Sequence, residues 1–435
     1  MPKSSSRQFG TTSKAVTPNS YHVKYVKVTP NNADPIDIND LVQQFNIVES
    51  LNSPTIQLNI VIADAINFLD DYKLEGNELV EILIQRNPLS DDVQNKVNFK
   101  LSLYIADIHG YVRNVQGKQY YQLLCVSKHM YNDQVRNLSR AFNGSIGTLV
   151  SNICKRDLKI QPSSINTSTK STIKGIYPSL KPITAINWLM RNAYDSGTPF
   201  YFYETAKDGV VFDSYNNMTQ KESYSTYDNA SFFMNEPGSE EAYEEERKRI
   251  KKISSPLNIS KYSSIANGTF AATTHVLDIA NKKYTKNQFG YKDSKQKKLN
   301  VNKPFSDIKI MDQSIDQLKE SKNYYISTNT KSYDGYDNYH RPASETLSRA
   351  EAHLNNLDFI TQEIVINGDF ELSVGMVISL KIAKSTDLDF SQESGLIDKH
   401  LSGKYLVTEI DHSFKEQYTQ RLTLKKDSSE VDLNA

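Results

Sequence analysis

The sequence contains few cysteines. Only two, Cys125 and Cys154, occur among its 435 residues. This low content excludes a disulfide framework and is typical of a protein made in a reducing cytoplasm. We expect Cys125 to lie in a strand and Cys154 in a helix, both as small buried side chains.

The sequence also lacks a long apolar run. No stretch approaches the ~20 residues that a membrane helix needs, so we expect no membrane segment. Residues 1–20 are polar and carry Lys3, Arg7 and Lys14, but not the apolar core of a secretory signal, and we expect a flexible arm. Lys plus Arg (51) equals Asp plus Glu (51), so net charge gives no reason to expect a nucleic-acid binder.

Catalytic motifs are missing as well. There is no Cys-x-x-Cys, His-Glu-x-x-His, Gly-x-Ser-x-Gly or phosphate-binding glycine loop. A segment with Asp334, Asp337 and His340 could bind a cation, but it lacks the acidic ligand that completes a calcium loop, and an exposed loop is favoured. The histidines are scattered singly: His22, His109, His129, His275, His340, His353, His400 and His412. We therefore expect no catalytic residue, no cofactor, no metal site and no enzymatic activity.

Strand patterns dominate both ends of the chain. Residues 55–62 alternate apolar and polar side chains, and further strands are predicted over 79–84, 99–105 and 120–126. A turn at Glu75-Gly76-Asn77 places Gly76 where a positive φ is often needed. Near the C-terminus, four more alternating segments follow each other: 359–370, 372–380, 403–412 and 418–424. This meander is typical of a small antiparallel barrel or sandwich.

The middle of the chain is mixed. Helices are predicted over 137–157 and from Pro182 onward, followed by a hairpin over 200–213, and together they indicate an α+β insertion. A charged helix is predicted over 239–253, acidic first and basic second, most simply as a solvated helix or else as a contact with a charged partner. A last helix, from Pro342, precedes the C-terminal strands.

One basic segment allows several interpretations. Residues 282–303 hold eight lysines and one acid, interleaved with Tyr284, Phe289 and Tyr291. Such a segment could follow a single-stranded nucleic acid or meet lipid head groups, but a flexible, soluble surface loop is favoured. The 26 tyrosines beside one tryptophan weakly favour a role in an assembly.

The two β-rich ends resemble a known family. The order of Glu49-Ser50-Leu51, Ser53-Pro54, the alternating strand and Glu75-Gly76-Asn77 resembles the first tube-like domain of phage tail hub proteins. The stretch 372–378, then 403–414 and a last strand with Tyr418, resembles the second. The chain is thus similar, over about half its length, to the central baseplate hub proteins of contractile-tailed phages. It departs from their pattern in the Lys- and Tyr-rich residues 282–339.

This resemblance implies a mostly β fold with an α+β insertion. Two tube-like antiparallel β-barrel domains, each with a flanking helix, would accompany an inserted helix-helix-hairpin domain, which such hubs carry after the first barrel. The expected division is an arm (1–20), a first tube-like domain (21–130), an insertion (131–222), a return segment with the charged helix (223–275), a variable segment (276–340) and a second tube-like domain (341–435).

The resemblance also implies a structural role in the virion. Three chains would form a pseudo-sixfold hub ring that joins the tail tube to a trimeric central spike and lets DNA pass as cargo. Further expected partners are the tape-measure protein and baseplate wedge proteins, and synthesis would take place in the host bacterial cytoplasm. A receptor- or glycan-binding tail β-protein is the main alternative, and a tail-associated cell-wall hydrolase is a weaker one.

Overall fold

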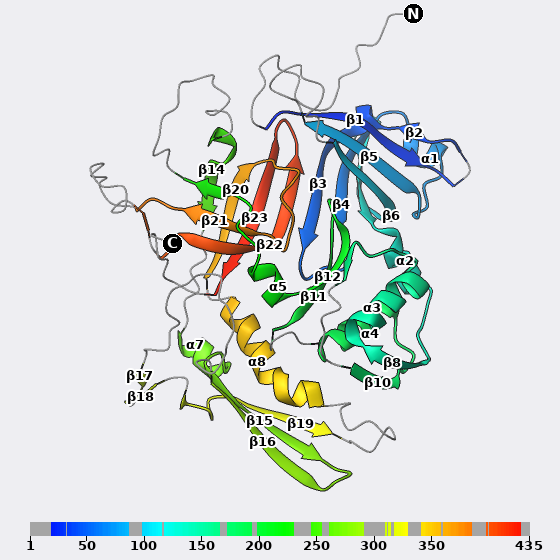
Figure 1. Ribbon diagram of the computed structural model, residues 1–435. Coiled ribbons are helices and arrows are strands. Elements are labelled where there is room, and N and C mark those ends of the chain that lie inside the picture. The colour runs from blue at the N-terminus through cyan, green and yellow to red at the C-terminus, as the bar shows by residue number, and fades with distance from the viewer. Residues whose placement is uncertain are drawn as a thin grey trace, which may run out of the picture.

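The computed structural model describes most of the chain (Figure 1). The described residues are 19–31, 33–86, 98–114, 117–165, 172–193, 198–229, 245–254, 261–290, 309–310, 312–314, 317–328, 341–357, 360–384, 397–398 and 400–427. Strands predominate among them, with a few helices, so the fold is mostly β. Thirteen strands belong to one large, mainly antiparallel sheet.

The first part of this sheet is built from the N-terminal strands, which we call the first unit. In spatial order they are β3 (Val42–Ser50), β4 (Gln57–Asp64), β7 (Gln119–Val126), β6 (Asn98–Arg113), β5 (Leu79–Arg86), β1 (Tyr21–Thr29) and β2 (Ile36–Asp37). A 3-10 turn (Asn39–Leu41) and α1 (Phe68–Asp71) lie between them in the chain, and α2 (Lys128–Gln134) follows β7. The predicted alternation is confirmed in β4, where Leu58, Ile60 and Ile62 enter the core.

The second part of the sheet, the second unit, is built mainly from C-terminal strands. In spatial order they are β14 (Ile250–Ser254), β20 (Ile360–Asn367), β23 (Tyr418–Lys426), β22 (Gly403–Phe414), β21 (Val377–Lys381) and β13 (Thr226–Asp228). The four predicted C-terminal strands are present, but the second begins only at Val377, and β20 pairs with β23 and not with β21, so the predicted meander is wrong at this point. Only β13 is parallel to its neighbour. In the part of the chain described, no ladder closes a barrel, although β13 and β14 meet at one bridge, Asp228 with Arg249.

Strand β22 belongs to both units. Its residues Gly403–Leu406 pair with β21, whereas Glu409–Phe414 pair with β3 of the first unit. The change of partner occurs at Thr408, whose carbonyl accepts a hydrogen bond from the Leu51 N–H (3.0 Å). Beyond this point Phe414 stacks on Phe45 in the first core, with ring centroids 4.6 Å apart. One continuous strand therefore fixes the two units to each other.

The insertion forms a core of its own. Its elements are β8 (Ala141–Ser145), α3 (Ile146–Ile153), a π-helix (Cys154–Leu158), β9 (Ser164–Ile165), β10 (Thr172–Ile176), α4 (Pro182–Met190), β11 (Phe200–Thr205), β12 (Gly209–Ser214) and α5 (Tyr215–Thr219). The helix at Pro182 and the hairpin are confirmed. The helix predicted from Asn137 begins only at Ile146, because residues 141–145 pair with β10 and Ser145 caps the helix by accepting from the Thr148 N–H.

The predicted charged helix is wrong over its second half. Residues 250–254 form strand β14 on the edge of the second unit, and residues 239–244 lie outside the described part. A register shift between Ile250 and Lys252 lets both Ile250 and Ile253 face the second core. Burial of these two isoleucines outweighs the helical charge pattern.

A separate three-stranded sheet lies at the lower end of Figure 1. From here on we call this sheet the arm, and the name no longer refers to residues 1–20. It consists of β16 (Lys283–Gly290), β15 (Ala271–Asp278) and β19 (Asn323–Thr328), with α7 (Lys261–Ala266), β17 (Lys309–Ile310), β18 (Gln313–Ser314) and α8 (Arg341–Leu357) as the remaining elements of this region. The flexible loop predicted for 282–303 is therefore wrong over 283–290, and residues 291–303 lie outside the described part.

Helix α8 packs mainly on the arm. Phe289 of β16 and Ala352 of α8 are buried together, whereas Leu357 enters the second core and the His353 ring lies 6.1 Å from that of Tyr215 in the same core. We expected this helix to pack beside the C-terminal strands, and this holds for its C-terminal part. The contact with α8 buries apolar side chains of the sheet such as Phe289, which explains why the helix packs there.

Gly368, directly after β20, is expected to tolerate no side chain. A Cβ there would lie 1.8 Å from the Tyr418 ring, which is stacked on Phe414 (4.3 Å) and Phe370 (4.7 Å) and cannot move aside. Overpacking of this kind costs about 1–3 kcal/mol or more, so Gly368→Ala should clearly lower the urea midpoint of unfolding.

Gly117→Ala is the matched control for this change. Gly117 has open space around it, and its φ of +79° makes an alanine cost only about 1 kcal/mol. Equal midpoints for the two variants would show that the Tyr418 contact does not constrain position 368.

Candidate functional site

The hairpin β11–β12 of the insertion lies against the place where the two units meet. The Ala206 N–H at its tip donates to the Glu49 carboxylate of β3 (2.9 Å). Glu204 on β11 accepts from the Ile56 N–H (3.0 Å) and the Ser127 hydroxyl (2.5 Å). These bonds fix the insertion to the first unit. The Lys207 side chain binds Glu371 of the second unit, so the hairpin contacts both.

A buried polar network lies beneath this hairpin. Glu49 and His412 are each 1% exposed, and His412 Nε2 lies 3.6 Å from Glu49 Oε1. The other ring nitrogen, Nδ1, lies 2.8 Å from the Tyr418 hydroxyl and 3.3 Å from Gln420 Nε2. Gln420 in turn donates to the Asp369 carbonyl (2.7 Å). The network joins β3, β22 and β23, and its depth suits it to hold strands together.

The sequence did not predict this network. His412 looked isolated, and no carboxylate of the sequence stood out as a candidate partner. Because side chains alternate along a strand, His412 and Asp411 point to opposite faces of the sheet. Asp411 accepts a hydrogen bond from the Asn46 side chain on its own face (3.0 Å). The pairing of β22 with β3, between residues far apart in sequence, brings His412 to Glu49.

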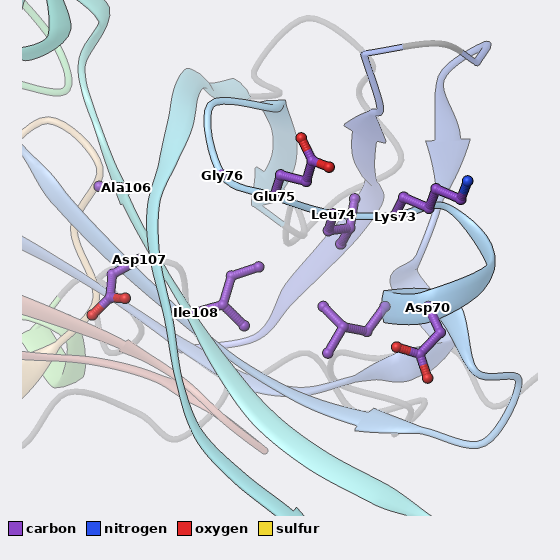
Figure 2. Close-up of a pocket in the computed structure, with 9 residues that line it drawn as sticks. Asp70, Lys73, Leu74, Glu75, Gly76, Ala106, Asp107 and Ile108 are labelled. Carbon is purple, nitrogen blue, oxygen red and sulfur yellow. The ribbon is translucent and has the colours of Figure 1, made fainter.

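An open pocket lies on the first unit between the segment around α1 and strand β6 (Figure 2). Its volume is about 590 Å³. The lining residues are Leu69, Asp70, Lys73, Leu74, Glu75, Gly76, Ala106, Asp107 and Ile108. Three carboxylates and one ammonium give the pocket a net negative charge, while three larger apolar side chains line it as well.

A buried carboxylate shapes the wall of this pocket. Glu78 is 1% exposed, and its two oxygens accept from the N–H groups of Glu75 (2.9 Å) and Gly76 (3.0 Å). The Asn77 N–H donates to the Ile105 carbonyl of β6 (2.7 Å). The predicted turn with a positive φ is confirmed, since φ of Gly76 is +98°. The pocket is therefore held open by hydrogen bonds.

The remaining candidates for chemistry are the two cysteines and the possible metal ligands. Both cysteines are buried as predicted, and burial raises the pKa of the Cys154 thiol to about 12. Within the described ranges, no three His, Cys, Asp or Glu side chains come close enough to hold a metal ion. The segment with Asp334, Asp337 and His340 lies outside them. No described helix is long and apolar enough to cross a membrane.

The fold has counterparts among solved structures. No protein-family model matches the sequence, and no curated protein matches it. The tail protein from Neisseria meningitidis MC58 superposes with a TM-score of 0.51 at 10% identity, covering 94% of this chain and 97% of that one. The 43 kDa tail protein of prophage MuSo2 from Shewanella oneidensis gives a TM-score of 0.54 at 9% identity, covering 93% and 99%. The chain therefore shares the fold of these tail proteins.

Proposed function

We propose that the chain is a structural component of a phage tail baseplate, where three copies form a hub ring between the tail tube and the central spike. The observation that carries this proposal is the near-complete mutual coverage with two tail proteins. Shared fold alone does not define function. Here, however, the similarity extends over 94% and 93% of this chain, which supports the proposal.

The joined units support the ring. We propose that residues 21–130 and 341–435 contribute two tube-like domains, which β22 holds in a fixed relation. Three chains would then present six domains around one axis, with closed cyclic symmetry. Such a ring matches a six-subunit tube on one side and a three-subunit spike on the other, and DNA would pass through its bore.

We also propose that the chain works by binding alone, within the virion. Its partners would be further copies of itself, the trimeric spike, the tube, the tape-measure protein and the wedge proteins. The buried Glu49–His412 pair supports a structural role, because the hairpin β11–β12 covers it. Peptidoglycan turnover by the purified chain would contradict this proposal, and Glu49→Gln would then test the pair.

The solution mass tests the ring directly. Light scattering coupled to size exclusion should give three times the 49.5 kDa of the chain, alone or after co-expression with a spike protein. A monomer under both conditions would contradict the trimeric hub and favour a glycan-binding tail protein. Retention of the tube and spike proteins on the tagged chain tests the two partners independently of its own association.

A further inference from the structure

The outer face of the arm carries a row of three stacked rings. His275 lies on the central strand β15, between Tyr284 of β16 and Tyr325 of β19. The centroid of its ring lies 5.9 Å from that of Tyr284 and 4.9 Å from that of Tyr325, at interplanar angles of 23° and 13°. His275 Nε2 and Asn323 Oδ1 are 3.1 Å apart, and Nδ1 bonds the Tyr284 hydroxyl. The row is therefore rigid, and we call it, with Leu277, the ridge.

The side chains of the ridge are exposed to solvent, and the core of the arm lies on the other face of the sheet. Tyr325 is 78% exposed, Tyr284 59% and Leu277 51%. The opposite face of the sheet already packs on α8 through Phe289 and Ala352. Rigid aromatic side chains that remain in solvent, in a row, are typical of a contact surface.

The charge around the ridge limits what can cover it. Lys286 lies on the same face, directly opposite His275. Lys282 and Lys283 lie at the adjoining hairpin turn, where Lys283 is in register with Asp278 on the other face of the sheet. The outer-face positions in register with the ridge carry no acidic residue: Thr273, Gln288, Asn323 and Ser327. A partner should therefore combine apolar area with negative charge.

The row offers open ring faces at its two ends. His275 lies between Tyr284 and Tyr325, whose outer faces remain exposed. A base or a sugar that stacks on such a face is one outcome of the test below. A row of rings that projects from a sheet is also suited to enter a depression on another protein.

The pocket of the first unit has the complementary properties. Asp70, Glu75 and Asp107 supply negative charge, and Leu69, Leu74 and Ile108 supply apolar surface. The lining residues lie around α1 and on β6, and Figure 1 shows α1 at the end of the molecule away from the arm. A chain that carries ridge and pocket at separate places can join copies head to tail.

We propose that the ridge of one copy docks into the pocket of the next copy. Only the closure of this contact into a ring of three rests on the proposed function, and the contact itself does not. The lysines of the hairpin would face the carboxylates of the pocket, and the aromatic rings would cover its apolar residues.

Charge reversal tests the contact. The ridge variant carries Lys282→Glu, Lys283→Glu and Lys286→Glu, and the pocket variant carries Asp70→Lys, Glu75→Lys and Asp107→Lys. Sedimentation velocity should show self-association weakened at least about tenfold in each variant. A chain with all six changes restores opposite charges and should regain most of the association. Tyr325→Ser, which alters no charge, should also weaken it, and circular dichroism verifies the fold of every variant.

Several results would overturn the proposal. The first is a parent chain that stays monomeric at every concentration. The second is unchanged association in both triple variants. The third is a chain with all six changes that associates as weakly as either triple variant. Binding of a single-stranded oligonucleotide or a glycan by the ridge, with association intact, would assign the surface to another ligand. If the chain associates through the ridge but retains neither the tube nor the spike protein, the contact stands and the hub proposal is contradicted. If the chain retains both proteins and the triple variants associate as the parent does, the hub proposal stands and the contact is contradicted.

Discussion

The folded protein is expected to gain stability between pH 7 and pH 10 through one residue, Lys426. Its side chain is fully buried, and Nζ donates to the carbonyls of His400 (2.6 Å) and Ser402 (2.9 Å) over the Tyr405 ring (5.0 Å). Burial lowers the pKa of this ammonium to about 7, despite the opposing charges of Asp398 and Asp427. The ordinary pKa is 10.5, so between these values the unfolded chain binds a proton that the folded chain does not.

The sign of the effect follows from this difference. Stability rises with pH wherever the unfolded state binds more protons, and the penalty for burying the charge is complete only below about pH 7. The gain up to pH 10 should be on the order of 3–5 kcal/mol. Burial raises the pKa of buried tyrosines such as Tyr405, which lowers stability at the alkaline end. We therefore take the difference in the free energy of unfolding between the parent and Lys426→Met, measured with urea at each pH. This difference should show the gain.

A lysine on the surface supplies the control. Lys24 is exposed on β1, and Lys24→Met keeps every tyrosine and Lys426 itself. The difference between the parent and this variant should stay flat from pH 7 to 10. A flat difference for Lys426→Met as well would mean that the folded protein keeps Lys426 charged over the whole range.

The strands were predictable where alternation and burial coincide. Strand β4 has one face in a core and one outside, so the period of two is visible in its residues. The same holds for β23 near the C-terminus. Helix α4 was predictable because Pro182 marks its start and one apolar face follows.

Features that depend on distant partners were not predictable. Residues 250–254 have the charge pattern of a helix and become a strand because β20 offers an edge. Residues 283–290 have few apolar side chains and become a strand because β15 pairs with them. The pocket depends on Glu78, whose burial is decided by the contact of its loop with β6. Local propensity carries no information about such pairings.

Glu49 is expected to be the residue whose loss most damages the junction of the two units with the insertion. Glu49→Ala removes the carboxylate that accepts from the Ala206 N–H and lies beside His412. The Ala206 N–H and the buried His412 ring then lose this partner. Each buried polar group that is left without its hydrogen-bond partner costs about 1–3 kcal/mol, and Glu49 serves two such groups. The urea midpoint should fall accordingly. Hydrogen exchange of the Ala206 amide should accelerate, because the hairpin β11–β12 loses its bond to β3.

Two comparisons separate this effect from a general loss of charge. Glu49→Gln keeps the shape and an acceptor for the Ala206 N–H, so it should cost less, about 1–2 kcal/mol. Glu81→Ala removes a carboxylate that only faces the exposed Lys100 at 3.9 Å, and should change stability by less than about 1 kcal/mol. A Glu49→Ala variant as stable as Glu81→Ala would show that the units hold together without the network. In that case β22 alone, through its pairing with both β3 and β21, would join them.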